Sequence, residues 1–341
     1  MKGFAKHIGR SALWGAVFSL AIMCVVIPAY AADFPRGNII LVTGNTPGSG
    51  GDLFSRAVAQ AVNGTPLLNG YSLIVENRPG ASGGNALNYV KNARPDGYTV
   101  LVYTISQTLN EILNDLPVGI KDFTPLCSIL RDDQMLLVQG DSKWKTLKEL
   151  VDDAIANPGQ QVWGRGVPSG ADTLSQLIFL KSVPGVENVD VKSIPYDGGG
   201  ELLTALLGRH VDVATVEYNE AKAQLDSGRL RALGVLAAER SPVLPDVPTA
   251  KEFGYDTVII RPRGFLVPKG TPADMVETLT AIFKTAVENE KFVKEQTDAA
   301  ATIMWSDSEG FGKILDDLHK YYVDVDIKGM ARKEAEAVRG N

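Results

Sequence analysis

Histidine and cysteine are scarce in this chain of 341 residues, which contains three His and two Cys. Cys24 lies near the N-terminus, so Cys127 is the one Cys in the main part of the chain, and it can form no intramolecular disulfide. Outside the N-terminal segment the only His are His210 and His319, too few and too far apart in sequence for a zinc site. We therefore expect no metal and no cofactor. Because the neighbours of Cys127 are apolar, we expect it to be a small buried residue.

Positive charge is also in short supply. The chain has 34 Lys and Arg against 40 Asp and Glu, a formal net charge of −6. This excess of acid excludes a general affinity for nucleic acid or for anionic lipid. Hydrophobic residues at 45% and charged residues at 22% are typical of a globular protein, and the length suggests about two domains.

The N-terminal segment has the pattern of a secretory signal peptide. Three basic residues within the first ten precede an uncharged, mostly apolar run over 12–27, and Ala29-Tyr30-Ala31 supplies the small residues of a cleavage site. We predict that residues 1–31 are removed near Ala31 and that the protein is exported. Two alternatives are an uncleaved membrane anchor, for which the run is short, and a lipoprotein at Cys24.

Strand-like and helix-like segments alternate, which predicts an α/β protein with mostly parallel sheets. The expected strands are 39–43, 73–76, 98–103, 135–139, 161–163, 211–216 and 232–236. The expected helices are 53–62, 85–93, 146–157, 172–181, 201–207, 221–227, 273–289 and 308–322.

Three glycine-rich loops each link an expected strand to a helix, at 44–52, 164–172 and 195–201. In open parallel sheets such loops lie at the carboxyl ends of the strands, where ligands bind. Glycine lets backbone N–H groups approach a ligand, and a helix N-terminus attracts an anion, so three such loops can hold a carboxylate without a lysine. The alternative is three ordinary turns in which Asp52 and Asp172 cap the helices.

Arginines near these loops are further candidates. Arg165 lies in the second loop, and Arg261 and Arg263 lie at an expected crossing between domains. A guanidinium can bind a carboxylate with two hydrogen bonds, although the same arginines can instead pair with acids of the protein. Hydroxyl and amide groups in the segment 103–108 can complete a polar pocket.

One motif points to a different class of protein. The segment 80–84 matches the G-x-S-x-G pattern of serine hydrolases, with Ser82 as nucleophile. A hydrolase needs a base, and neither His210 nor His319 has a recognisable triad context. A secreted hydrolase therefore remains the alternative to a binding protein. The loop at 44–52 has no lysine and does not match a nucleotide-binding motif.

Several collinear motifs carry a resemblance to a known family. They are Val75–Asn85 (VENRPGASGGN), 94–99 (RPDGYT), 122–126 (DFTPL), 195–200 (PYDGGG), 208–212 (GRHVD), 228–233 (GRLRAL), 240–249 (RSPVLPDVPT) and 267–272 (VPKGTP). On these motifs the chain resembles the extracytoplasmic substrate-binding proteins of tripartite tricarboxylate transporters, also called Bug proteins. The resemblance spans nearly all of the chain after residue 31.

The resemblance implies a two-lobed periplasmic binding protein fold of type II, in which each lobe is a mostly parallel sheet flanked by helices. It implies a non-enzymatic periplasmic protein, expected to be a monomer, that binds a small organic acid between the lobes and delivers it to membrane permease subunits. That acid is a carboxylate, and the resemblance implies the range that family members take: citrate and other di- or tricarboxylates, amino acids, nicotinate or aromatic acids. We expect residues 33–130 and 260–341 in lobe 1 and 131–259 in lobe 2. A sensor that presents its ligand to a signalling receptor is an alternative.

The loops and the resemblance together give the candidate ligand-binding residues. They are Asn45, Thr46, Gly48, Ser49, Gly50, Asp52, Thr104, Ser106, Gln107, Arg165, Ser169, Ala171, Asp172, Thr173, Tyr196, Asp197, Gly198, Arg261 and Arg263. The chain departs from the family where Arg261 and Arg263 replace an aromatic pair. Our hypothesis is that the extra arginine favours a ligand with a second carboxylate.

Overall fold

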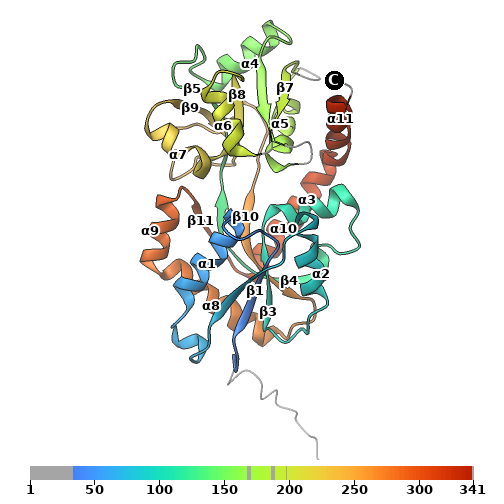
Figure 1. The fold of residues 1–341 in the computed structure, drawn as a ribbon, viewed down its shortest axis with the longest axis vertical. Helices are drawn as coiled ribbons and strands as arrows, with labels where there is room; N and C mark the ends of the chain where they lie inside the picture. The colour runs from blue at the N-terminus through green and yellow to red at the C-terminus, as the bar shows by residue number, and fades with distance from the viewer. Residues whose placement is uncertain (1–33, 167–169, 186–188, 197, 340–341) are drawn as a thin grey trace, which may run out of the picture.

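The computed structural model describes residues 34–166, 170–185, 189–196 and 198–339, arranged as two lobes stacked along the long axis (Figure 1). Each lobe contains one β-sheet with helices on both faces. The two-lobed α/β fold predicted from the sequence is confirmed. The predicted signal peptide and two candidate site residues, Ser169 and Asp197, lie outside the described residues.

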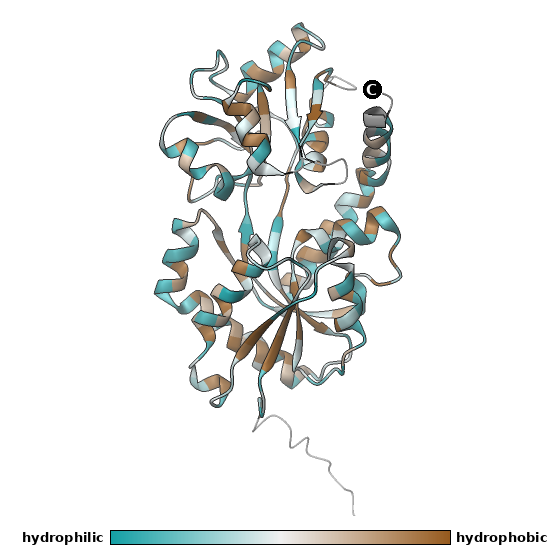
Figure 2. Ribbon diagram, in the orientation of Figure 1, coloured by the Kyte–Doolittle hydropathy of each residue, from teal (hydrophilic) through white to brown (hydrophobic). Residues whose placement is uncertain are grey.

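The sheet of the first lobe has six strands in the order β11-β4-β10-β3-β1-β2. Their bounds are β1 Ile39–Thr43, β2 Leu73–Asn77, β3 Thr99–Tyr103, β4 Phe123–Asp132, β10 Arg261–Pro268 and β11 Thr302–Ser306. The apolar sequences of β1 and β3 place these strands in the middle of the lobe, where they run as brown ribbons in Figure 2.

Helices cover both faces of this sheet. They are α1 Gly50–Val62, α2 Gly84–Lys91, α3 Ile105–Asn114, α8 Ala273–Glu288, α9 Glu290–Asp298 and α10 Ser308–Asp324. The buried residues of α1 and α8 form one apolar cluster with the sheet, and those of α2 and α10 form another with its opposite face. In the first cluster Phe265 of β10 stacks between Phe54 of α1 and Phe283 of α8. Cys127 is buried in the same cluster, as predicted.

The sheet of the second lobe has five strands in the order β7-β6-β8-β5-β9. The strands are β5 Gln134–Gln139, β6 Val162–Arg165, β7 Lys192–Pro195, β8 Val213–Glu217 and β9 Leu230–Val235, and the helices are α4 Leu147–Ala156, α5 Ala171–Lys181, α6 Gly199–Leu207 and α7 Tyr218–Asp226. Apolar side chains of α4 and α5 pack on one face of the sheet, and Leu side chains of α6 pack on the other.

Both sheets are mixed rather than mostly parallel. β1 pairs in parallel with β2 and β3, and β6 does so with β7 and β8. The remaining pairs, which involve β4, β10 and β11 in one lobe and β5 and β9 in the other, are antiparallel. The parallel expectation therefore holds for the half of each sheet that carries strand–helix loops. The chain enters and leaves the second lobe through the antiparallel strands.

Two extended segments connect the lobes, and a helix bridges them. β4 of the first sheet ends at Asp132 and β5 of the second begins at Gln134, while β10 returns the chain to the first sheet at Arg261. The C-terminal helix α11 (Ile327–Arg339) contacts both α3 and α5. The boundaries that we expect for the two lobes remain a proposal. The structure adds that α11, at the C-terminal end of the chain, also packs on lobe 2. In the part of the chain that is described, no helix has the length and apolar character of a membrane span.

Candidate ligand-binding site

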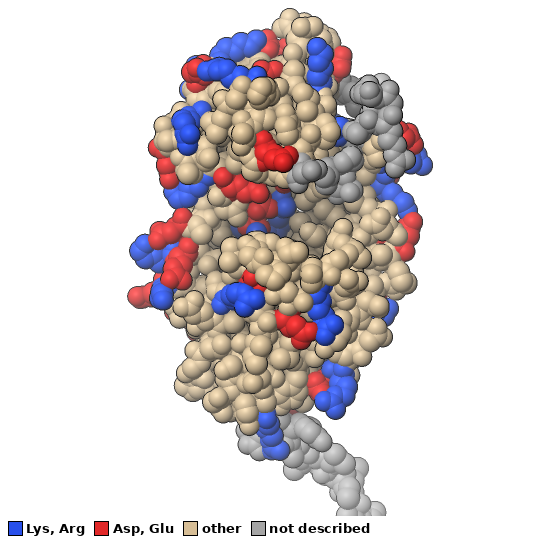
Figure 3. Space-filling model, in the orientation of Figure 1, with Lys and Arg blue, Asp and Glu red and all other residues tan. Residues whose placement is uncertain are grey.

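A cavity of about 620 Å³ lies between the two lobes. Figure 3 shows acidic and basic atoms gathered in the hollow at this level. Six of the residues predicted from the sequence line it, all from lobe 1 or the returning strand: Asn45, Gly50, Thr104, Ser106, Arg261 and Arg263. The volume is in the range of natural small-molecule sites.

The lobe 1 wall of the cavity is made by the N-termini of two helices. Gly50 and Gly51 begin α1, and Thr104 is the N-cap of α3, whose second residue is Ser106. The backbone N–H of Thr104 donates to Oε1 of Gln107 over 2.9 Å, which fixes the start of α3. Helix N-termini carry a partial positive charge and N–H groups without intrahelical partners, so this wall suits an anion.

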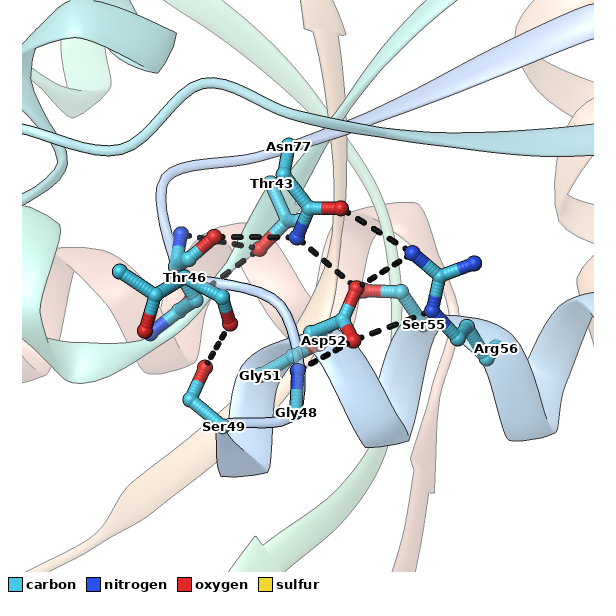
Figure 4. A network of polar contacts seen from close by, with 10 residues as sticks. Thr43, Thr46, Gly48, Ser49, Gly51, Asp52, Ser55, Arg56 and Asn77 are labelled. Carbon is cyan, nitrogen blue, oxygen red and sulfur yellow. Dashed lines mark hydrogen bonds and ion pairs between the residues drawn. The ribbon is translucent and has the colours of Figure 1, made fainter.

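Asp52 anchors the loop in front of α1 (Figure 4). Its carboxylate accepts hydrogen bonds from the Gly48 N–H at 2.8 Å, from Nε of Arg56 at 3.0 Å and from Nδ2 of Asn77 at 2.8 Å. The hydrogen bond from Arg56 is the main reason that the pKa of Asp52 falls to about 2. Asp52 is thus fully engaged within the protein, and its role is to shape the loop.

The lobe 2 wall was not predicted from the sequence. Glu217 at the end of β8 and Asn219, Glu220 and Lys222 in α7 line the cavity. They occupy the same strand-to-helix position as the predicted loops, at the carboxyl end of a strand. This junction contains no glycine, so its composition does not indicate a ligand loop; its position at the carboxyl end of a strand is the signal that could have found it.

The two arginines of β10 are paired with acids from both lobes. Arg261 lies 2.8 Å from Asp172 and 2.7 Å from Glu217, both in lobe 2. Arg263 lies 2.6 Å from Asp132 and 3.6 Å from Glu217, and its Nη1 also donates to the Gly50 carbonyl oxygen over 2.8 Å. Glu217 therefore connects with both arginines, and Arg263 links the start of α1 to the opposite lobe.

Burial, together with neighbouring carboxylates, raises two pKa values in the cavity. Burial is the main cause for Glu220, with the charges of Glu217 and Asp172 adding to it, and together they raise its pKa to about 7. Burial and the charge of Glu217 likewise raise the pKa of Asp132, although Arg263 opposes them. The cavity is thus rich in carboxylates that are costly to ionise together.

Comparison with known proteins agrees with this architecture. Residues 54–323 match the model of the tripartite tricarboxylate transporter family receptor, TctC. The chain belongs to this receptor family. A "UPF0065 protein in gbd 5'region" of Cupriavidus necator is 33% identical over 82% of this chain and 84% of its own length. The protein BugT of Bordetella pertussis is 26% identical over 89% of this chain and 92% of its own.

Solved structures share the fold of this TctC-family receptor. A TctC solute-binding protein from Polaromonas, solved without ligand, has a TM-score of 0.78 and 27% identity, covering 88% of this chain and all of that one. Two proteins of Rhodopseudomonas palustris, each 24% identical, have TM-scores of 0.68 and 0.66. They cover 88% and 87% of this chain and 98% and 100% of their own.

The remaining predicted residues of the receptor lie beside the cavity or away from its lining. Thr46, Gly48, Ser49, Asp52 and Gln107 support the lobe 1 loops. Arg165, Ala171, Asp172, Thr173, Tyr196 and Gly198 are in lobe 2, outside the cavity lining. Of these, Asp172 contributes indirectly, because it binds Arg261 and accepts a hydrogen bond from Gln134. The described lobe 2 residues that line the cavity lie at the start of α7, which we did not predict.

The serine of the hydrolase-like motif has no catalytic partner within the described ranges. Ser82 lies in a left-handed turn with φ 50°, and no hydrogen bond joins it to a histidine there. The side chain of Asn110 supports the turn by donating to the carbonyl oxygens of Ala81 and Ser82. His319 instead lies 3.7 Å from Glu111. Nor do the described residues group three His, Cys, Asp or Glu side chains for a metal ion.

Proposed function

We propose that this receptor captures a small organic acid in the cavity between its lobes and delivers it unchanged to the permease subunits of a tripartite tricarboxylate transporter. The observation that carries the proposal is the convergence of three helix N-termini, those of α1, α3 and α7, on one cavity lined by both lobes. The α1 and α3 termini contribute no charged side chain to the lining, so they offer an acid backbone donors and hydroxyls.

The ligands of related receptors support the class of ligand. The two Rhodopseudomonas palustris proteins were solved with adipate and with malate, both small carboxylates. Ligands of this size fit a cavity of about 620 Å³. The residues that we propose for ligand contact are Asn45, Gly50, Thr104 and Ser106 in lobe 1, together with Glu217 and Glu220 in lobe 2.

Export and delivery follow from the same proposal. Residues 1–31 direct the chain to the periplasm, where it works as a soluble receptor. Two connecting segments between the lobes suit closure by hinge motion, because a hinge needs only a few residues that change their backbone angles. A closed lobe arrangement around the ligand is then the form that the permease recognises.

Filling the cavity tests the function. Ser106 is an exposed residue of the cavity wall, so Ser106→Trp should occupy the ligand space without disturbing the core. In a thermal-shift screen of small organic acids, the unaltered protein should gain stability with at least one acid, and Ser106→Trp should lose that gain. At a hundredfold excess over Kd the gain is about 2.7 kcal/mol.

The control is Ala281→Trp, at an exposed position of α8 away from the cavity, which should keep the full shift. Ser82→Ala should bind like the unaltered protein. An acid whose stabilisation survives in Ser106→Trp would place the binding site elsewhere, and turnover that is lost in Ser82→Ala would show a hydrolase.

A further inference from the structure

The connection from lobe 1 to lobe 2 contains a buried carboxylate that does not line the cavity. Asp133 lies between the end of β4 and the start of β5, and it is 3% exposed. Its Oδ1 atom lies 3.0 Å from Nε of Arg131. Its Oδ2 atom accepts hydrogen bonds from two hydroxyls, that of Ser241 at 2.5 Å and that of Thr302 at 2.7 Å. Both hydroxyl residues are buried.

The two hydroxyls on this carboxylate come from different lobes. Ser241 follows β9 of lobe 2, in the motif at 240–249, whereas Thr302 begins β11 at the edge of the lobe 1 sheet. Their hydroxyl oxygens are 3.3 Å apart. Because each lobe supplies one donor and the connection supplies the acceptor, hydrogen-bond geometry lets the three groups meet only over a narrow range of angles between the lobes.

The segment that leads to Thr302 joins this cluster to the cavity. Ala299 and Ala301 line the cavity. Ala300 between them has a φ of 68°, at the position after a helix where glycine is the usual residue. It is buried in an apolar cluster that it shares with lobe 2 residues such as Tyr218. The segment 299–302 of lobe 1 therefore reaches the cavity, the core of lobe 2 and the buried carboxylate at once.

Asp133 also fixes the lobe 2 wall of the cavity. Its carbonyl oxygen accepts a hydrogen bond over 3.1 Å from the N–H of Tyr218, the first residue of α7, and Glu220 of the same helix lines the cavity. The preceding residue, Asp132, lies on the cavity side, where it contacts Arg263. The position of the lobe 2 wall relative to lobe 1 thus depends on how Asp133 is held.

From these contacts we propose that Asp133, Ser241 and Thr302 form an interlobe latch, which holds the lobes in the arrangement of this structure and thereby sets the width of the cavity. The three are positioning residues, because none of them lines the cavity. A rotation of the lobes that separates Ser241 from Thr302 leaves buried polar atoms without partners, which is costly. The inference goes beyond capture and delivery and does not depend on which acid is bound.

Distances between spin labels test the latch without any ligand. Lys284→Cys on α8 and Asp152→Cys on α4 place one label on each lobe at exposed positions, while the native Cys127 is buried. Double electron–electron resonance should then show one main interlobe distance. Ser241→Ala and Thr302→Val should each raise the ratio of other arrangements to this one about tenfold, since a hydrogen bond to a charged group is lost. The double variant should show a second distance population.

Two control variants separate the hydroxyl from packing. Thr302→Ser keeps the hydroxyl and should keep the single main distance. Thr271→Val removes a buried hydroxyl that donates to the Pro268 carbonyl oxygen over 2.8 Å within lobe 1, and it should keep this distance too. Melting temperatures are measured for every variant, because a merely structural role would lower them without changing the interlobe distance.

Three outcomes would contradict the latch. One is a double variant with the same distance distribution as the unaltered protein, and another is a change in Thr302→Ser as large as that in Thr302→Val. The third is a broad distribution in the unaltered protein, because the lobes would then not be held. None of these outcomes bears on the receptor function, which the thermal-shift screen tests separately.

Discussion

Asp52 and Glu220 lie at the starts of two helices, yet their environments give their carboxylates opposite properties. Asp52 is buried and accepts hydrogen bonds from Gly48, Arg56 and Asn77, so the charged form is stabilised and the pKa falls to about 2. For Glu220, burial and the charges of Glu217 and Asp172 outweigh Arg261 and a backbone hydrogen bond from Glu217, so its pKa rises to about 7. Asp52 therefore serves the structure of the loop, and Glu220 is available to a ligand.

Replacing Asp52 by Asn should destabilise the protein. At pH 7 we expect the free energy of unfolding to fall by about 1–3 kcal/mol, because charged hydrogen bonds are replaced by weaker ones. The side chain at position 52 is buried, so water cannot replace the lost hydrogen bonds. The folded pKa lies below the ordinary value of 3.8, so the stabilisation is fully present above pH 4 and is lost as the pH falls towards 2. Asp52→Asn should remove this part of the acid sensitivity.

Urea unfolding between pH 2 and pH 7 measures the effect. Asp298→Asn is the control, because Asp298 forms an exposed pair with Lys294 that should contribute little. Equal stability of Asp52→Asn and the unaltered protein at pH 7 would contradict the role of Asp52.

Among the elements, β10 decides the geometry of the cleft, and it was not predicted from the sequence. Pro262, Pro268 and two arginines interrupt its apolar pattern, so the segment is unlike an ordinary strand. In the structure it is a central strand between β3 and β4, and its register shifts between Arg263 and Gly264. Arg263 thereby reaches the cleft while Phe265 packs in the core.

Gly264 is where this strand fits against its neighbours. A Cβ at this position would collide with the Cys127 carbonyl oxygen and lie 2.8 Å from the Phe311 ring. Gly264→Ala should therefore destabilise the protein by about 1–3 kcal/mol, as overpacking of a core does, and should weaken ligand binding by shifting Arg263. Thermal unfolding and titration with the tightest acid of the screen measure the two effects.

Gly200→Ala is the matched control for Gly264. A Cβ at Gly200 meets no atom within 4 Å, and the residue lies in the first turn of α6. We expect this variant to be neutral or to gain up to about 1 kcal/mol. If the two alanine variants were equally stable, the close packing of β10 against β4 would not limit the stability of the protein.

At the scale of the whole molecule, the C-terminal helix joins the lobes. Ile327 and Ala331 of α11 are buried in an apolar cluster that also contains Phe179 of α5 in lobe 2. On the lobe 1 side, Lys328 forms an ion pair with Asp115, which follows α3. The lobes are therefore held by three connections, and the third can resist or guide closure around a ligand.

Ile327→Ala should show how much the packing of α11 contributes to the stability of the protein. Ile327 is fully buried, and removing a buried Ile side chain to Ala costs about 2–5 kcal/mol. Lys333→Ala, on the exposed face of α11, should change stability by less than about 0.5 kcal/mol. Urea unfolding followed by circular dichroism compares the two, and equal effects would show that α11 does not stabilise lobe 2.

The part of the site that the sequence predicted and the part that it missed differ in the residue composition of their strand–helix junctions. The loop before α1 and the start of α3 follow apolar strands with glycine or hydroxyl residues, and both line the cavity as predicted. The loops before α5 and α6 have the same composition, and their described residues Arg165, Tyr196 and Gly198 are not part of the lining. Composition marks a strand–helix junction, and the parallel pairing of β6, β7 and β8 puts all three of their junctions at one edge of the sheet, but which side chains of that edge line the cavity depends on the tertiary structure.

The amino-acid sequence alone predicts the α/β class, the apolar strands and most helices, because periodicity and chain breakers are local. Its motifs also determined the receptor family. The pairing of Glu217 in lobe 2 with both Arg261 and Arg263 depends on the three-dimensional fold, since these residues are more than forty positions apart in sequence. The charge that a ligand meets depends on these long-range pairs, which no local pattern encodes.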